Sequence, residues 1–310
     1  MPSDIELSLA KSWRCPECSQ ALPIDRFLRQ QLSGISWNRT RRLITTGKIS
    51  INGKVVRDTS DPVRGGDDVQ YNPNAQNKPT SNQAKVALLY IDSQIVVADK
   101  PAGISSVPFD EHERGTLIDL VRQSLHSLEH GRVSTVHVVH RIDKETSGIV
   151  VFARTQSSLK TLKQLFRAHD IDRRYLAIVE GKLGNRTFSS RLVADRGDGK
   201  RGSTTNPRLG RIATTHVRPL EYLNSTTLVE CRLETGRTHQ IRIHLAEAGH
   251  PLLGERVYSK TETTLVTVPR IMLHAAHLAF RHPLTGVPQV HSLDMPEDMR
   301  AIAQRLRVTK

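Results

Sequence analysis

One segment of nine residues contains side chains that could carry acid–base or nucleophilic chemistry: His140-Arg141-Ile142-Asp143-Lys144-Glu145-Thr146-Ser147-Gly148. Largely apolar residues flank it, at 136–139 and at 149–153. A carboxylate beside a turn between two apolar runs is partly buried, and such burial is costly unless the group is paired or used in chemistry. Composition alone would also fit an ordinary polar β-turn, in which the glycine permits the reversal and the Thr-Ser pair bonds the backbone locally. The segment makes Asp143 a candidate catalytic carboxylate.

The whole segment resembles the central motif of the RluA family of pseudouridine synthases, His-Arg-Leu-Asp-x-x-Thr-Ser-Gly, with Ile142 as a conservative departure. In that family the aspartate is catalytic, so the resemblance implies that Asp143 is the catalytic residue. It also implies that Arg141 fills the space left by a flipped uridine or holds that nucleotide's phosphate. By the same resemblance, His140 lies beside it near the RNA backbone.

Three further segments resemble motifs of this family, in the order that the family requires. Residues 172–181 are similar to its Lys-x-Tyr-x-Ala-x-Val-x-Gly strand, with Arg173 in place of the lysine. Residues 234–244 are close to Thr-Gly-Arg-x-His-Gln-Ile-Arg-x-His, and residues 271–275 resemble the Leu-His-Ala strand. Four ordered motifs over roughly residues 87–290 make the resemblance specific.

The resemblance assigns roles to three residues outside the aspartate motif. A carboxylate in such a pocket needs a cationic partner to remain ionised, and in the family this partner is the arginine at the position of Arg242. Tyr175 supplies a ring that stacks on uracil and a hydroxyl for proton transfer, while Leu273 packs against the base as an apolar wall. A surface salt bridge for Arg242 and a core position for Tyr175 are the alternatives. Residues 253–258 depart from the family's Gly-Asp-x-x-Tyr-Gly, which we interpret as a divergent loop without loss of a catalytic group.

The reaction implied by the resemblance is the isomerisation of uridine to pseudouridine, which breaks an N-glycosidic bond and forms a carbon–carbon one. Because a uridine in folded RNA must leave its stack to be reached, base flipping is implied. We predict no cofactor, metal or nucleotide, and the sequence has no Gly-x-x-x-x-Gly-Lys-Ser/Thr loop or His-Glu-x-x-His helix. His239 and His244 lie in an expected strand at 237–244 and would face opposite sides of it, so we interpret them as structural or RNA-contacting.

Residues 22–72 form a compact basic module. Helical spacing at residues 24–32 and 37–44 is followed by a strand that turns at Asn52-Gly53, a strong hairpin signal. This order resembles the RNA-binding domain named after a small-subunit ribosomal protein. The basic residues that we expect to contact RNA are Arg39, Arg41, Arg42, Lys48 and Lys54. A generic solvated charged face is the alternative.

The remaining chain suggests the domain boundaries. We expect a tail at 1–21, a flexible linker at 73–86, a catalytic domain at 87–300 and a C-terminal tail at 301–310. Cys15 and Cys18 in the first tail are half of a zinc knuckle, and without two further nearby ligands we favour incidental cysteines over a shared zinc site. The fold class predicted for the catalytic domain is α+β, with a mixed, mostly antiparallel sheet flanked by helices. Residues 191–211 are expected to form a long basic loop over RNA.

Composition agrees with an RNA-binding enzyme. The 310 residues carry a formal net charge of +14, which is typical of partners rich in phosphate. No apolar run approaches the roughly 20 residues needed to span a bilayer, and three cysteines fit a reducing cytosol. We therefore expect a cytoplasmic monomer that contacts no membrane and acts on RNA, with large-subunit ribosomal RNA preferred over tRNA. A ribosome-assembly factor that binds RNA without catalysis is the alternative from another class.

Overall fold

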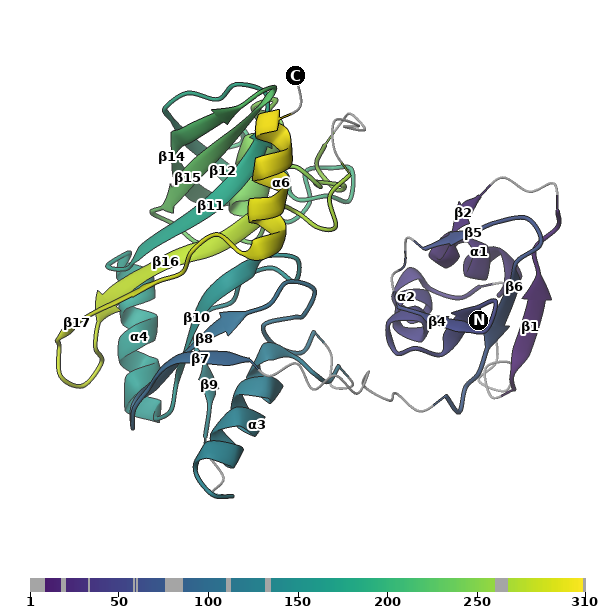
Figure 1. Ribbon diagram of the computed structural model, residues 1–310, viewed down its shortest axis with the longest axis horizontal. Coiled ribbons are helices and arrows are strands. Elements are labelled where there is room, and N and C mark those ends of the chain that lie inside the picture. Colours follow the sequence, from purple (N-terminus) through teal and green to yellow (C-terminus); the bar gives the residue numbers. More distant parts are fainter. Residues whose placement is uncertain are drawn as a thin grey trace. The chain divides into compact units, whose positions relative to one another are not determined.

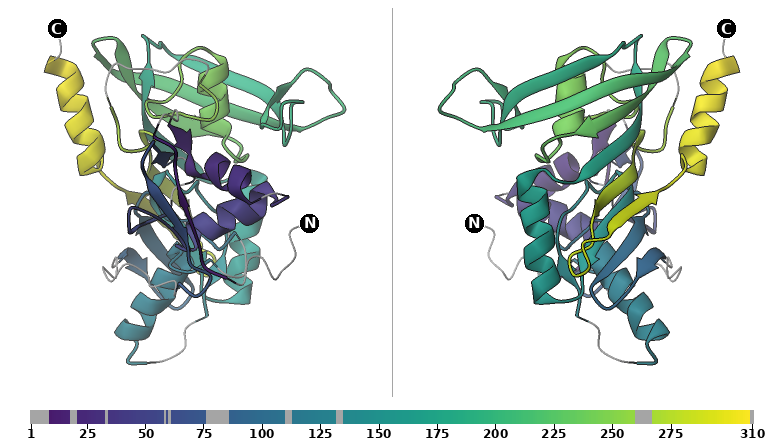
Figure 2. Two further views of the ribbon diagram at one scale, coloured as in Figure 1. Left: turned by 90° about the vertical axis from the view of Figure 1, so that its right-hand side faces the viewer. Right: turned by 90° about the vertical axis from the view of Figure 1, so that its left-hand side faces the viewer.

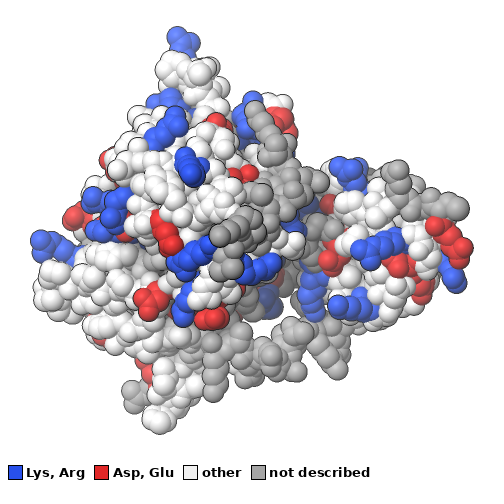
Figure 3. Space-filling view, turned by 45° about the horizontal axis from the view of Figure 1, so that its top comes forward, with Lys and Arg blue, Asp and Glu red and all other residues white. Residues whose placement is uncertain are grey.

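The computed structural model describes residues 9–17, 21–32, 34–57, 59, 61–75, 86–109, 113–131, 135–259 and 267–308. The chain divides into two compact units, Met1–Gln83 and Ala84–Lys310 (Figure 1). Lys and Arg side chains are spread over both units on the face drawn in Figure 3. Among the described residues, no helix is long and apolar enough to cross a membrane. Most of the predicted linker, residues 76–85, lies outside the described residues.

The described residues of the N-terminal unit form two helices and a small antiparallel sheet. The helices are α1 (Ile24–Gln31) and α2 (Trp37–Thr45), as predicted. The sheet has the order β1-β6-β3-β4, with β1 at Lys11–Arg14, β6 at Asp68–Tyr71, β3 at Ile49–Ile51 and β4 at Lys54–Val56; β2 (Leu22–Pro23) pairs separately with β5 (Pro62–Val63). The β3–β4 turn occurs at Asn52 (φ 50°) and Gly53 (φ 77°), where positive φ at both positions matches the twist of a tight hairpin.

The predicted tail at 1–21 is wrong for residues 11–15. Strand β1 pairs with β6 from Lys11 opposite Tyr71 to Arg14 opposite Asp68, and Trp13 packs against the core of the unit. Cys15 is buried, and its backbone N–H donates to the Asp67 carbonyl at 2.8 Å. The segment is thus held by ladder hydrogen bonds that a tail would have left to water. Cys18 lies outside the described residues.

The described part of the second unit is built on one sheet of eleven strands, and its fold class is the α+β one predicted. The order along the sheet is β13-β12-β14-β15-β11-β16-β10-β8-β7, with β17 also paired to β16 and β9 to β10. Every described pairing is antiparallel except that of β10 with β16. The strands are β7 (Ala87–Ile91), β8 (Ile95–Lys100), β9 (His137–Val138), β10 (Ser147–Ala153), β11 (Asp172–Glu180), β12 (Arg186–Val193), β13 (Gly202–Thr204), β14 (Arg211–Leu223), β15 (Thr226–Leu233), β16 (Leu273–Arg281) and β17 (Pro288–Ser292).

Helices cover both faces of this sheet (Figures 1 and 2). Those in the described parts of the unit are α3 (Leu117–Leu128), α4 (Gln156–Ala168), α5 (Gln240–Glu247) and α6 (Glu297–Val308). Alternate residues of a strand point to opposite faces, so the strand contacts identify the side of each helix. Val150 of β10 packs in the cluster that contains α3, whereas Val151 packs with α4. Ala177 of β11 packs with α5, whereas Ile178 packs with α6.

Two segments that were predicted to be irregular contain regular structure. The predicted C-terminal tail at 301–310 is wrong for residues 301–308, which continue α6 and bury Ile302 and Leu306. The expected loop at 191–211 is largely the end of β12, a turn and β13, with Ser203 bonded through its backbone N–H to Glu247 of α5 at 2.9 Å. The segment is thus anchored by strand pairing, by the contact with α5 and by the buried side chain of Leu192.

Candidate active site

Asp143 lies in the turn that leads into β10, at the middle of the sheet. Its backbone carbonyl accepts from the Thr146 N–H at 3.1 Å, and its side chain is 24% exposed. The turn ends at Gly148, whose φ is +115° and whose backbone approaches β16 so closely that a Cβ would lie 2.2 Å from the Ala275 carbonyl oxygen. Only glycine fits this combination of φ and close approach. The parallel pairing of β10 with β16 therefore fixes where the turn presents its carboxylate.

A buried lysine supports the turn from behind. Lys100 is fully buried, and its Nζ donates to the carbonyls of Pro101 (3.0 Å), Ile104 (2.7 Å) and Lys144 (2.9 Å). Burial lowers the pKa of Lys100 to about 7, against the opposing effects of Glu145 and Asp143. The Lys100 amine thus connects the loop at residues 101–104 to the turn that carries Asp143, two segments that are not paired as strands. Sequence reasoning did not find this residue, although a lysine at the end of a largely apolar strand was a signal for it.

Arg242 faces the carboxylate from α5. Its Nη1 lies 3.9 Å from Asp143 Oδ2, while Nε and Nη2 donate to the two oxygens of Glu255 at 2.7 and 2.8 Å. The Glu255 side chain is fully buried and also accepts from the backbone N–H groups of Val257 and Tyr258. Hydrogen bonds and the charge of Arg242 overcome burial and lower the pKa of Glu255. The fork–fork pair leaves one guanidinium nitrogen directed at Asp143.

The element that carries Arg242 differs from the one expected. Residues 240–247 form helix α5, so the predicted strand at 237–244 is wrong. Its residues from Gln240 to Leu245 are all buried, which means that neither helical nor strand periodicity could appear in the sequence. The helix places His239 and Arg242 on the same side, and Asp143 lies 3.9 Å from both, whereas His244 bonds to Thr215 and Ser190.

The predicted base-binding residues come from two adjacent strands. Tyr175 of β11 is opposite Ala275 of β16, and Tyr175 and Leu273 pack in one apolar cluster. Burial raises the pKa of Tyr175, the charge of Asp143 raises it further, and Arg173 opposes both. The phenol therefore remains protonated at neutral pH. Tyr175, Leu273, Arg242 and Asp143 are thus brought together at one place on the sheet.

His140 and Arg141, the two residues before Ile142, differ in exposure and in their contacts. Arg141 is exposed. The His140 ring instead stacks on Phe166 with centroids 4.6 Å apart, and its Nε2 accepts from the Val151 N–H at 3.1 Å. Burial lowers the pKa of His140 to about 3. These contacts lie inside the protein, so the placement of His140 does not support the predicted contact with an RNA backbone.

The other predicted RNA contacts belong to the N-terminal unit. Arg39, Arg41, Arg42 and Lys54 are exposed, and Lys48 is half-buried.

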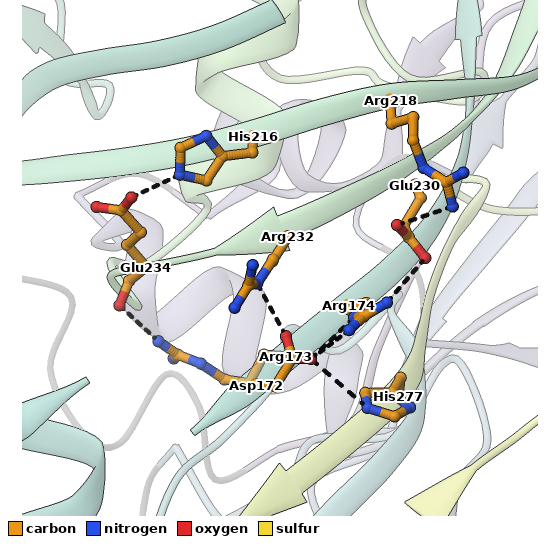
Figure 4. A network of polar contacts seen from close by, with 9 residues as sticks. All are labelled: Asp172, Arg173, Arg174, His216, Arg218, Glu230, Arg232, Glu234 and His277. Atoms are coloured by element: carbon orange, nitrogen blue, oxygen red, sulfur yellow. Dashed lines mark hydrogen bonds and ion pairs between the residues drawn. The ribbon is translucent and has the colours of Figure 1, made fainter. Parts of the chain in front are cut away.

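In the second unit, a network of polar contacts links β11, β14, β15 and β16 (Figure 4). Asp172 accepts from Arg174 and Arg232, and the Arg173 guanidinium donates to the Glu234 carbonyl. No group of three or more His, Cys, Asp or Glu side chains that could hold a metal occurs among the described residues.

Two family models match the chain. The model described as RNA pseudouridylate synthase matches residues 94–247, and the S4 domain model matches residues 22–69. Among solved structures, Human RNA Pseudouridylate Synthase Domain Containing 4 is similar with a TM-score of 0.60 and 25% identity, over 71% of this chain and 93% of that one. The fold and the two models define an RNA-modifying enzyme with a separate RNA-binding domain.

Curated relatives extend over nearly the whole chain. Ribosomal large subunit pseudouridine synthase D of Zymomonas mobilis is 33% identical over 92% of this chain and 94% of its own length. An uncharacterised RNA pseudouridine synthase of Bacillus subtilis is 32% identical over 92% of this chain and 94% of its own length. The chain belongs to the RluA-type family of RNA pseudouridine synthases, as its motifs predicted, and is an isomerase.

Proposed function

We propose that this enzyme isomerises specific uridines of structured large-subunit ribosomal RNA to pseudouridine, with Asp143 as the catalytic carboxylate. The observation that carries the proposal is the position of the Asp143 carboxylate, which faces Arg242 Nη1 at 3.9 Å beside Tyr175 and Leu273. The choice of RNA is supported by the names of relatives in Zymomonas mobilis, Nitrosomonas europaea and Xanthomonas campestris, each a ribosomal large subunit pseudouridine synthase D.

In the proposed reaction, Asp143 assists departure of uracil from the sugar, either by attacking the anomeric carbon or by stabilising charge there. The freed uracil turns, its C5 bonds to the anomeric carbon, C5 loses its proton and N1 gains one. Atoms and electrons balance within the nucleotide. The Arg242 guanidinium keeps positive charge beside the carboxylate.

The remaining site residues hold the base and the strand. Tyr175 provides a ring for stacking, and because its pKa is raised its hydroxyl is a hydrogen-bond donor at neutral pH. Leu273 forms an apolar wall. The uridine reaches this pocket by base flipping, and the exposed Arg141 fills the vacated place in the helix or binds the flipped nucleotide's phosphate. Docking on the RNA is provided by Arg39, Arg41, Arg42, Lys48 and Lys54 of the N-terminal unit.

Mapping pseudouridine in all cellular RNAs tests this proposal. A strain lacking the gene should lose specific pseudouridines from large-subunit ribosomal RNA, wild-type protein should restore them, and Asp143→Asn should not. Loss from tRNA alone would contradict ribosomal RNA as the substrate. An unchanged map together with a defect in ribosome assembly would identify a binding factor without catalysis.

A further inference from the structure

The His239 ring lies between Tyr258 and the catalytic carboxylate. Its Nδ1 is 2.6 Å from the Tyr258 hydroxyl, and its Nε2 is 3.9 Å from Asp143 Oδ1. The two rings meet edge to face at 74° with centroids 5.6 Å apart. Asp143 therefore has Arg242 opposite one oxygen and an imidazole opposite the other. None of the roles assigned above uses this imidazole.

The backbone at His239 is held in an uncommon conformation. Its φ of 58° and ψ of 20° are left-handed, at the residue that precedes α5. Residues other than glycine rarely adopt this region, and such strain persists only where surrounding contacts impose it, often at functional sites. Here the Gln240 amide oxygen accepts from the Arg237 N–H at 3.0 Å and from the Thr235 hydroxyl at 2.8 Å. The turn that aims His239 is thus fixed by its neighbours.

The same buried carboxylate supports both sides of Asp143. Glu255 binds the Arg242 guanidinium, and one of its oxygens also accepts from the Tyr258 backbone N–H at 3.2 Å. The loop that places the Tyr258 hydroxyl against His239 is therefore anchored to the arginine that faces Asp143. Any movement of one side is coupled to the other through Glu255.

The charges around His239 determine which of its nitrogens carries the proton. Burial lowers the pKa of His239, Asp143 and Glu255 oppose that effect, and Arg242 and Arg201 add to it; Tyr258 is the other titratable group against the ring. A neutral imidazole has one N–H and one acceptor nitrogen. A lone pair on Nε2 would be repelled by the carboxylate, so the hydrogen belongs on Nε2 and the Tyr258 hydroxyl donates to Nδ1.

We propose that His239, with its ring held by Tyr258, is a positioning residue that holds Asp143 by Oδ1 while Arg242 holds Oδ2. The inference rests on the proposed role of Asp143. The separation of 3.9 Å shortens to a hydrogen bond when RNA fills the pocket, as catalytic contacts do on substrate binding. A carboxylate held at both oxygens cannot rotate, so the same lone pair faces the sugar in every turnover.

Three variants separate positioning from packing. His239→Gln keeps an N–H donor close to the position of Nε2, His239→Asn tolerates the left-handed backbone but is too short, and Tyr258→Phe removes only the hydroxyl. The matched control is His277→Gln, because His277 also lies between a hydroxyl and a carboxylate. The hydroxyl is that of Ser292, at 2.9 Å. The carboxylate is that of Asp172, at 3.8 Å (Figure 4). The side chains of His239 and His277 are 28% and 22% exposed.

The measurements are single-turnover kinetics with RNA, melting temperature, and ¹⁵N chemical shifts of His239 in the free protein. We expect His239→Asn and Tyr258→Phe to lower the rate constant by about 10- to 100-fold, as misplacement of a catalytic group does, with RNA affinity unchanged. His239→Gln should keep most of the rate and His277→Gln all of it, and in Tyr258→Phe the ¹⁵N shift of His239 Nδ1 should move because this nitrogen loses its hydrogen bond.

Several results would overturn the proposal. Wild-type rate constants in His239→Asn and Tyr258→Phe would contradict it. Equal decreases of the rate constant in His239→Gln and His239→Asn would also contradict it. Weakened RNA binding with an intact rate would instead make His239 an RNA contact. Asp143→Asn is assayed beside them. If Asp143→Asn remains active, the proposed function itself fails; if it is inactive while all His239 and Tyr258 variants match wild type, only the positioning role fails.

Discussion

At the scale of single residues, the pair formed by Arg242 and Glu255 determines where positive charge lies in the site. Both Glu255 oxygens are occupied by the guanidinium, and both side chains are buried. A planar guanidinium bound at two points cannot rotate its remaining nitrogen away from Asp143. The sequence offered Glu255 only as a departure from the family's usual aspartate, whereas the structure shows its partner.

Glu255→Gln should therefore damage both stability and activity. Removing one charge from a buried ion pair leaves the other uncompensated, which costs about 3–5 kcal/mol. Calorimetry should show the loss in the unfolding transition of the catalytic unit, and the rate of pseudouridine formation should fall with it. Glu255→Asp, which keeps the charge, should be milder in both measurements. Equal behaviour of the two variants would contradict a role for this charge.

Two histidines, the half-buried His140 and the buried His274, make stability depend on pH. The pKa of His140 is lowered to about 3 and that of His274 to about 4, each mainly by burial. Between these values and about 6.5 the unfolded chain binds protons that the folded chain does not, so the stability present above pH 6.5 is lost as pH falls. His140→Gln, which retains an acceptor for the Val151 N–H, should flatten this decline.

Chemical denaturation at pH 7.5 and pH 5 measures that effect. His126→Gln, on the exposed side of α3, is the control and should leave the decline unchanged. Both tryptophans, Trp13 and Trp37, belong to the N-terminal unit, so circular dichroism or hydrogen exchange must report on the catalytic unit in place of tryptophan fluorescence. A decline that is identical in His140→Gln and in wild type would contradict the assignment.

At the scale of elements, the parallel contact of β10 with β16 holds the Asp143 turn in place. Gly148→Ala adds a methyl group that would meet backbone atoms of Ala275, at a φ that L-residues avoid. We expect a loss of stability of at least about 3 kcal/mol, the upper end of overpacking costs, and reduced activity. Gly103→Ala is the control, because its φ is also positive but its Cβ would meet no atom within 4 Å. Equal melting temperatures for the two variants would contradict a steric role.

Elements with a clear periodicity were predictable from the sequence, and the others were not. Helices α1, α2, α3 and α4 have apolar residues on one face only, and the Asn52-Gly53 turn has the residues that positive φ demands. Helix α5 has no polar face, because six successive residues are buried. Strand β1 is short and polar apart from Trp13, and its order depends on pairing with the distant strand β6. The end of α6 does have helical spacing, with buried residues at 299, 302, 303 and 306, so the prediction of a tail there overlooked a signal that the sequence contains.

The residues of the site also divide into those that could be predicted from the sequence and those that could not. Asp143, Tyr175, Arg242 and Leu273 could be recognised from their motifs, and the structure places them at one point of the sheet. Lys100, His239 and Glu255 were not assigned to the site from the sequence, because the contacts that place them there, with Lys144, Asp143 and Arg242, join residues more than ten positions apart along the chain. Residues that orient the groups of a site from behind can be identified only once the fold shows their contacts.

At the scale of the whole molecule, the two units divide binding and chemistry. Replacing Arg39, Arg41 and Arg42 with alanine should weaken RNA binding and flatten the plot of log affinity against log salt concentration. Each lost phosphate contact lowers the slope by about 0.7 to 0.9. The rate at saturating RNA should remain, because these residues belong to the other unit from Asp143.

A control variant removes three positive charges from the catalytic unit instead of the N-terminal unit. Lys160, Lys163 and Arg167 are exposed on α4 of the catalytic unit. Their replacement with alanine should change the slope less than the N-terminal triple variant does. If the N-terminal variant kept wild-type affinity and slope, residues 22–72 would not be the docking domain, and contacts of the catalytic unit, such as those of the 191–211 hairpin, would have to provide the binding.

The role of Asp143 is tested most directly by Asp143→Asn with purified protein and substrate RNA. The substitution keeps the size and polarity of the side chain and removes the negative charge that faces Arg242. Pseudouridine is measured under single-turnover conditions, beside RNA affinity, with mass spectrometry to exclude wild-type or deamidated protein. We predict no pseudouridine and unchanged affinity. Measurable turnover by Asp143→Asn would contradict the account.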